Sequence, residues 1–449
     1  MNVTAVSRRI DAVMRFFLYV LIAWLPYSNA AVEICVVASV VLWFFKRGLL
    51  FMNAGRGGQL SLKTFLTILR PVPTRLDMPI FVFLLICLVS SLFSRQPLET
   101  LADFMTKTLE WFVVFYLAAE VMTHKNHIRI ALGLLILTSV VTALDSFIQY
   151  YLTGHDILRG RMLTRQGASA AFNHANSLGI YMAMAIPIVG AALTTVRRIG
   201  LRVLGGFVLG LLFWSLSITF SRGAWLAAGA GLIVLLFFRH PRFAFYLFSG
   251  LIITLLLIFI LCPDDMLLPL RLNKESLVST FSWRWGLWED SLKMIRARPW
   301  LGHGINTFME YFQDYRRKAF EGPMMERFFT PQPYAPTYAH NSYIQLTAEL
   351  GWLGLASFLW IIFRFVRNSV TMLLSSNHQP MQFLLAGIFS GLVAFLLHCF
   401  IDTDLYSLRL AVYFWLWFGI SASLARMNWP SNNLSSQTVF ERNVMRHEE

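Results

Sequence analysis

The sequence predicts an all-α polytopic membrane protein. Hydrophobic residues make up 57% of the chain and charged residues only 14%, a composition that does not suit a water-soluble surface. The apolar residues gather in long runs, and a bilayer core of about 30 Å needs about 20 such residues per helix. On this scale we predict about twelve transmembrane helices, with one long polar segment between the ninth and the tenth.

The twelve spans are predicted from the apolar runs alone, and two of them are short. The first and the fourth span are short enough that one of them could be re-entrant. The predicted spans are 13–27, 30–46, 78–94, 108–122, 129–152, 171–195, 203–220, 223–238, 243–262, 343–365, 382–400 and 409–425. The domains follow from these spans: 1–262 holds helices one to nine, 263–342 a loop subdomain, 343–426 helices ten to twelve, and 427–449 a tail.

Short basic loops predict the orientation, because Lys and Arg resist translocation across a membrane. In the twelve-span arrangement these loops all fall on one side, from Arg8 and Arg9 near the start to Arg364 and Arg367 after the tenth span. That side is predicted to be cytoplasmic. Both termini then lie inside, and residues 263–342 lie outside.

The net charge of +14 does not require a nucleic-acid partner. Most of the excess positive charge lies in the short loops that set the orientation, so we expect no nucleic acid to bind. The four cysteines lie in or beside apolar spans and show no disulfide framework or metal-ligand spacing. We therefore expect no metal and no cofactor.

The long outer segment is predicted to pack as a small helical subdomain, because a structureless loop of about 80 residues is uncommon in a compact protein. Trp285, Trp288, Leu292 and Ile295 recur at helical spacing, and Pro299 should end their helix at or before the preceding residue. We expect this amphipathic helix to lie on an apolar surface.

The rest of the outer segment is predicted to turn and then to extend. A turn at Gly302, Gly304 and Asn306 precedes a short helix at 309–320. The Pro-rich stretch 321–338 should be extended, and it leads directly to His340.

His340 opens the run His340-Asn341-Ser342-Tyr343 at the start of the tenth span. An imidazole whose ordinary pKa is near 6.5 can take a proton from a hydroxyl at neutral pH. A histidine at a helix start can equally make an ordinary hydrogen bond. Asn341 or Ser342 can serve as the N-cap of the span, and Glu349, two turns further on, is interpreted as a structural buttress.

Two arginines at the outer boundary are candidates for binding a phosphate group. Arg222 stands in the short turn Ser221-Arg222-Gly223, and Arg284 lies among tryptophans. A planar guanidinium matches phosphate oxygens in a bidentate way. The alternatives are a snorkelling side chain for Arg222 and a cation–π anchor for Arg284.

Two further polar groups lie on the outer side. Arg159, Arg161 and Arg165 precede the sixth span, where basic residues are disfavoured, so attraction of an anionic head group or a phosphorylated acceptor is one reading and simple translocation of the loop is the other. Asp402 and Asp404 lie between the last two spans. They are either an ordinary polar turn or groups that orient His340 or hold the acceptor.

Together these residues resemble a known signature. Arg284, Trp288, Pro299, Gly302, Gly304, Asn306 and Phe308, followed by His340-Asn341, Glu349, Gly351 and Gly354, are similar to the pattern of the O-antigen ligase and polymerase superfamily. Ser221-Arg222-Gly223, Arg165 with Asn176, and the pair Asp402 and Asp404 also match it. The resemblance covers roughly residues 160–425.

The resemblance implies a metal-independent membrane glycosyltransferase of the GT-C class in the bacterial inner membrane, active on its periplasmic side. Its partners would be a glycan donor on undecaprenyl diphosphate, a lipid A-core acceptor and membrane lipids. His340 would activate the acceptor hydroxyl while Arg222 and Arg284 neutralise the diphosphate. Arg161, Arg165, Asn176, Asn341, Asp402 and Asp404 are expected to bind substrate. The three catalytic side chains should face one pocket.

The sequence is compatible with several functions. The chain length and the single long loop favour an O-antigen ligase. An O-antigen polymerase or a protein O-oligosaccharyltransferase would use the same donor with another acceptor, which the sequence does not distinguish. A secondary transporter, from a different class, would predict internal repeats and charges near the middle of the membrane.

Overall fold

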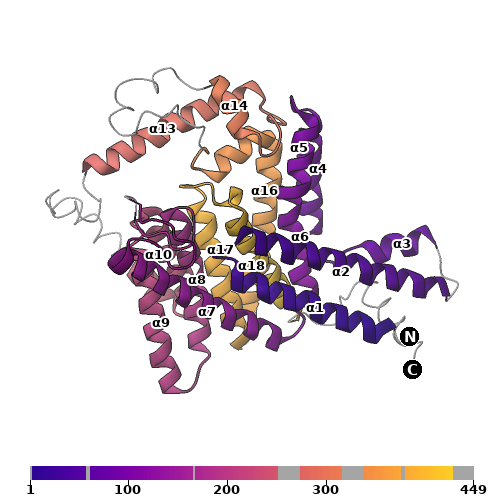
Figure 1. Cartoon of the computed structure of the whole chain (residues 1–449), viewed down its shortest axis with the longest axis horizontal. Coiled ribbons are helices and arrows are strands. Elements are labelled where there is room, and N and C mark those ends of the chain that lie inside the picture. Colours follow the sequence, from indigo (N-terminus) through magenta and orange to yellow (C-terminus); the bar gives the residue numbers. More distant parts are fainter. Residues whose placement is uncertain are drawn as a thin grey trace.

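The computed structural model describes residues 3–56, 61–164, 167–250, 274–315, 338–375 and 380–427. In these ranges the regular structure is helical, and the only β-type pairings are isolated bridges in the loop at 155–167. Near the middle of the molecule lie α16 (Ser342–Ser375), α17 (Pro380–His398) and α18 (Leu408–Met427). Helices α1 (Val3–Trp24) and α2 (Asn29–Arg56) run across this group and project to one side, and α13 (Lys274–Ala297) and α14 (Phe308–Tyr315) lie across one end (Figure 1).

Eight helices correspond to the first eight predicted spans. They are α1 (Val3–Trp24), α2 (Asn29–Arg56), α4 (Asp77–Leu92), α6 (Leu109–Val121), α7 (Lys125–Ile148), α8 (Ala175–Thr194), α9 (Ile199–Ser217) and α10 (Arg222–Phe237). The last three predicted spans are α16 (Ser342–Ser375), α17 (Pro380–His398) and α18 (Leu408–Met427). Short helices α3 (Leu62–Leu69) and α5 (Pro97–Asp103) and two π-helical turns, Phe104–Thr108 and Gln149–Thr153, lie between them.

Seven helices in the described ranges are long and apolar enough to cross a membrane, and α4 and α10 are shorter apolar helices. The polytopic, all-helical prediction is therefore confirmed, whereas the number of twelve spans is not. Helices α1 and α6, the two short predicted spans, are not among the seven. Most of the ninth predicted span, 243–262, lies outside the described residues, as does most of the predicted tail.

The core of the protein lies around the C-terminal helices. Helix α18 packs against α6, and α17 packs against α8 and α10. The side chains of Trp415 and Trp417 on α18 are fully buried. Helices that are buried on all sides in this way fix the positions of the loops at their ends, and one of those ends carries the predicted site residues.

The predicted outer helix is α13 (Lys274–Ala297), which ends before Pro299 as expected. The prediction of its buried face was partly wrong. Leu287, Met294 and Ile295 are buried, whereas Trp285 is 52% exposed and Leu292 is 41% exposed. The second predicted helix is α14 (Phe308–Tyr315), and residues 316–337 lie outside the described ranges.

The outer helices are joined to the membrane helices at a break in α16. Gly351 interrupts this helix with φ +67° and ψ −172°. The freed amide of Trp352 donates to the carbonyl of Pro299 at 2.8 Å, and the amide of Gly304 donates to the carbonyl of Glu349 at 2.8 Å. A Cβ atom on Gly351 would lie 2.2 Å from the carbonyl oxygen of Trp300, so only glycine fits this contact.

Glu349 completes the junction. Its buried carboxyl group accepts hydrogen bonds from the backbone amides of Asn306 at 2.8 Å and Phe308 at 3.2 Å, and from the hydroxyl of Tyr406 at 3.0 Å. These bonds cap the start of α14 and tie it to two other parts of the chain. The contacts agree with the buttress predicted from the sequence.

We predict that Gly351→Ala lowers the unfolding temperature of the detergent-purified protein. A side chain at this backbone conformation costs about 1–3 kcal/mol before the clash with Trp300 is counted. The matched control is Gly133→Ala on α7, where a Cβ meets nothing within 4 Å. Equal unfolding temperatures for the two variants would contradict the proposed junction.

Candidate active site

His340 lies in the turn before α16 in a strained backbone conformation. Its φ is +47°, which a residue other than glycine adopts only when neighbouring contacts impose it. The side chain remains 25% exposed, so the imidazole is held in place without being enclosed. Strain of this kind at an accessible titratable side chain is typical of functional sites.

The run that begins at His340 binds the end of α17. The amide of Ser342 donates to the carbonyl of Cys399 at 2.8 Å, and the side-chain amide of Asn341 donates to the carbonyl of Phe400 at 3.1 Å. The hydroxyl of Tyr343 donates to the carbonyl of Leu396 at 2.8 Å. Carbonyls at and beyond the end of a helix have no partner within it, and this run supplies their donors.

Asn341 also starts α16. Its side-chain oxygen accepts from the amides of Tyr343 and Ile344, both at 3.0 Å, as an N-cap does. Both ends of its amide are therefore engaged within the protein. We expect Asn341 to support the turn that holds His340 rather than to contact a substrate.

Asp402 holds the imidazole of His340. One carboxylate oxygen lies 3.0 Å from Nδ1 of His340, and the other accepts from the side-chain amide of Asn176 at 2.7 Å. Burial alone would raise the pKa of Asp402, but the hydrogen bond and charge of His340, with the charge of His398, outweigh it and hold that pKa below its ordinary value. Asp402 is therefore ionised at neutral pH.

This pairing fixes which imidazole nitrogen can act as a base. An ionised carboxylate only accepts hydrogen bonds, so Nδ1 of neutral His340 carries the proton and the lone pair is on Nε2. The geometry selects Asp402, rather than Asp404, as the group that orients His340. Asn176, predicted to bind substrate, instead contacts this carboxylate.

Helix α13 completes the surroundings of His340. The indole nitrogen of Trp288 donates to the carbonyl of Ala339 at 3.0 Å, and the ring of Trp283 lies 5.0 Å from the ring of His340. Arg284 follows Trp283. Burial lowers the pKa of its guanidinium, and the negative charges of Asp402 and Asp404 oppose that shift. Its Nε atom is buried and has no hydrogen-bond partner among the described residues.

Arg222 is the first residue of α10, with Ser221 as the N-cap. The next residue, Gly223, lies against the loop that carries Asp402. A Cβ atom on Gly223 would be 3.1 Å from the side chain of Ile401 and 3.2 Å from Nε2 of His398. The turn with Arg222 and the turn with Asp402 are therefore in contact, although they are far apart in the sequence.

The basic loop before α8 is held by a buried carboxylate. Asp156 accepts hydrogen bonds from the amides of Leu158 at 3.1 Å, Arg159 at 2.6 Å and Arg161 at 2.5 Å. Arg161 is partly buried, and no contact between it and His340 or Asp402 is seen. Arg165 lies outside the described residues, so its predicted role stays a prediction.

Sequence reasoning missed Arg409, which is 4% exposed at the start of α18. Its guanidinium donates to the carbonyl of Pro26, to the carbonyl of Ala171 at 3.1 Å and to the side-chain oxygen of Asn173 at 3.5 Å. It thereby joins the loop before α8, which leads to Asn176, to α18. An arginine at the edge of a strongly apolar span was the available signal.

The structure brings several of the predicted site residues near one another. Asp402 contacts both His340 and Asn176, Arg284 follows Trp283, whose ring adjoins the ring of His340, and the turn of Arg222 packs on the loop that carries Asp402. The shared pocket stays a prediction, because the segment 316–337 between α14 and this site lies outside the described ranges. In those ranges no three His, Cys, Asp or Glu side chains are grouped as a metal site would require.

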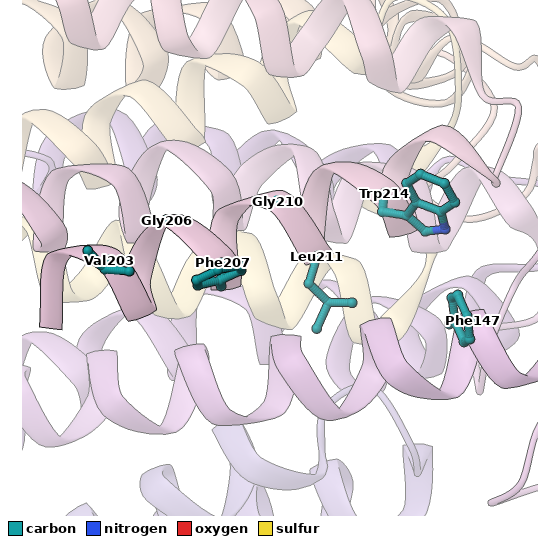
Figure 2. Close-up of a pocket in the computed structure, with 7 residues that line it drawn as sticks. All are labelled: Phe147, Val203, Gly206, Phe207, Gly210, Leu211 and Trp214. Carbon is teal, nitrogen blue, oxygen red and sulfur yellow. The ribbon is translucent and has the colours of Figure 1, made fainter. Parts of the chain in front are cut away.

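A separate apolar groove of about 700 Å³ lies between α7 and α9, as Figure 2 shows. Its lining includes Phe147, Phe207 and Trp214, with Gly206 and Gly210 keeping the face of α9 open. None of the predicted site residues lines it. Its size is ordinary for a ligand pocket, but it lacks the polar groups that chemistry requires.

Comparisons with known proteins bear directly on this site. The chain is 25% identical over 291 residues to a protein of Rickettsia prowazekii (strain Madrid E) that is provisionally named a polysaccharide ligase. That match covers 63% of this chain and 66% of the relative, just under two thirds of its length.

Residues 206–359 match the family described as O-antigen ligase. The chain resembles this family over that segment. The matched segment contains Arg222, Arg284 and His340, so all three predicted catalytic residues lie inside it. Asp402 lies outside the segment, and only the fold brings it to His340.

We predict that Asn176→Asp lowers glycan transfer at neutral pH at least about 10-fold. A carboxylate at 176 would face Asp402 in place of a donor, and a neighbouring like charge raises the pKa of Asp402 and disfavours the ionised form that holds His340. The control is Asn173→Asp, because Asn173 already accepts a hydrogen bond from Arg409. Similar rates for the two purified variants would contradict the role of Asp402.

Proposed function

We propose that the protein transfers an O-antigen glycan from undecaprenyl diphosphate to the lipid A-core oligosaccharide at the periplasmic face of the bacterial inner membrane. One observation supports this most strongly. The imidazole of His340 is oriented by an ionised Asp402 beside Arg284, with the turn of Arg222 packed on the same loop. The proposed site would thus combine a base with two cations, which a transfer from a diphosphate needs.

The proposed reaction is a direct displacement. The acceptor hydroxyl gives its proton to Nε2 of His340 as its oxygen forms a bond to the anomeric carbon of the donor sugar. The bond between that carbon and the diphosphate oxygen breaks, and the diphosphate leaves with the electron pair. The charge of Asp402 stabilises the imidazolium that forms. A single displacement inverts the configuration at the anomeric carbon.

Arg222 and Arg284 are proposed to stabilise the negative charge that grows on the leaving diphosphate. Charge-assisted hydrogen bonds from guanidinium groups in a partly buried site are stronger than the same bonds in water. We propose that these two cations suffice and that no metal ion takes part. Nε of Arg284 has no hydrogen-bond partner in the described part of the chain, and a phosphate oxygen could accept a hydrogen bond from it.

The arrangement of helix ends supports the proposed location. The starts of α8, α10 and α16 and the end of α17 all carry residues of this site. These ends therefore meet at one face of the bundle, and α13 lies over the same end (Figure 1). The distribution of basic loops predicts that this face is periplasmic.

The acceptor decides between the related functions. An O-antigen polymerase or a protein O-oligosaccharyltransferase could use the same base and the same two arginines. The name of the Rickettsia relative mentions a polysaccharide ligase, which favours the ligase.

A deletion strain tests the acceptor. Loss of a ligase should give lipopolysaccharide without O-antigen while long glycan accumulates on the lipid carrier, and the wild-type gene should restore the normal profile. Core with a single repeat attached would indicate a polymerase instead. An unchanged profile would contradict both functions.

We predict that Arg222→Lys and Arg284→Lys each lower glycan transfer by about 10²-fold, because a point charge cannot reproduce bidentate binding of the leaving diphosphate. The control is Arg198→Lys, at the exposed start of α9. Rates are measured with purified protein and the carrier-linked donor. Full activity of the two site variants would mean that these arginines act only through net charge or as anchors.

A further inference from the structure

A second pair of histidine and carboxylate lies next to the first. Nδ1 of His398 is 2.6 Å from a carboxylate oxygen of Asp404, and the two side chains are only 1% and 3% exposed. Asp404 follows Asp402 by two residues, so one short loop supplies both carboxylates. The proposed reaction does not use His398 or Asp404.

The far side of the His398 ring faces the turn of Arg222. The Cβ position of Gly223 lies 3.2 Å from Nε2 and 3.3 Å from Cδ2 of His398. The same Cβ atom would lie 3.1 Å from the side chain of Ile401, so a side chain on Gly223 would displace Ile401 and His398 by a few tenths of an ångström. Asp404 holds the opposite edge of the ring. The imidazole therefore lies between the turn of Arg222 and the loop that carries Asp404.

The loop between His398 and Asp404 thus contacts both His340 and the turn that carries Arg222. Asp402 orients His340, the proposed base, and His398 abuts the turn that carries Arg222, the proposed diphosphate ligand. The hydrogen bond from Asn176 to Asp402 adds the start of α8 to the same loop. A small displacement of His398 would therefore move Arg222 relative to His340.

We propose that His398 and Asp404 are positioning residues that fix the distance between Arg222 and His340, and so determine how the donor diphosphate is held for reaction. This inference rests on the proposed function. It assigns no contact between His398 and substrate. It does predict that substitutions at Gly223, His398 and Arg222 have non-additive effects on donor binding.

The first experiment is a double-mutant cycle of Gly223→Ala and His398→Asn. Alanine at 223 should push the imidazole away, raising the KM for the undecaprenyl diphosphate-linked donor about 10-fold or more. Asparagine at 398 is shorter and can still donate to Asp404. The double variant should therefore be no worse than His398→Asn alone. If the fold-increases in donor KM of the two single variants multiply to that of the double variant, to within about twofold, the two sites are independent and the proposal is overturned.

The control is Gly229→Ala on the same helix, where a Cβ meets nothing within 4 Å. It should leave the donor KM unchanged. A role in packing alone would lower the unfolding temperature of the His398 variants without changing the donor KM of the folded fraction, and that result would also overturn the proposal. Asp404→Asn keeps the size of the side chain and provides a second test if His398→Asn does not fold.

A binding measurement separates this inference from the proposed function. Undecaprenyl diphosphate, without glycan, is titrated into the detergent-purified protein. Gly223→Ala should raise its Kd. Arg222→Lys should weaken binding of undecaprenyl diphosphate less in the His398→Asn background than in the wild-type background. Wild-type protein that transfers no glycan but shows this coupling would refute the ligase function alone. Transfer without coupling would refute the positioning pair alone.

Discussion

The site depends on the way the run from His340 to Tyr343 completes the end of α17. Four groups of this run donate to carbonyls at and beyond the last turn of that helix. Each carbonyl would otherwise be left without a partner in apolar surroundings, which is costly. The chain therefore has to place this run against the loop after α17, and the positive φ of His340 is a consequence. Stability and the geometry of the proposed base arise from the same contacts.

The remaining elements hold this junction from the sides. Helix α13 binds the residue before His340 through Trp288, and the break at Gly351 ties the outer segment to α16. The junction thus brings together parts of the chain that lie on both sides of the long loop. A transferase that must bind both a lipid-linked donor and a large acceptor needs a site open to lipid and to water, and a junction at the helix ends provides such a position. Rigid helices there would hold the proposed base and the two arginines at fixed relative positions.

The sequence predicted the all-helical, polytopic fold, whereas the roles of the site residues stay predictions. His340, Arg222 and Arg284 were singled out because titratable groups at a membrane boundary are costly unless they have a function, and because their pattern resembles a family. The choice between Asp402 and Asp404 was not available, since the partner of each is decided by how α16 and α17 pack. The buried face of α13 was partly misjudged because Trp285 and Leu292 fit the helical period as well as Leu287 does. The apolar runs also do not show whether α1 and α6 cross a membrane, so the span count stayed unconfirmed.

Glycan transfer by His340→Ala, Asp402→Asn and the double variant, purified in detergent, tests the central claim most directly. If Asp402 acts through His340, each single change should lower the rate about 10²–10⁴-fold, the usual contribution of a positioned general base. The double variant should then be no slower than the slower single variant, because residues that act as a unit are not additive. Near-normal turnover by folded His340→Ala, or losses that multiply in the double variant, would contradict the account.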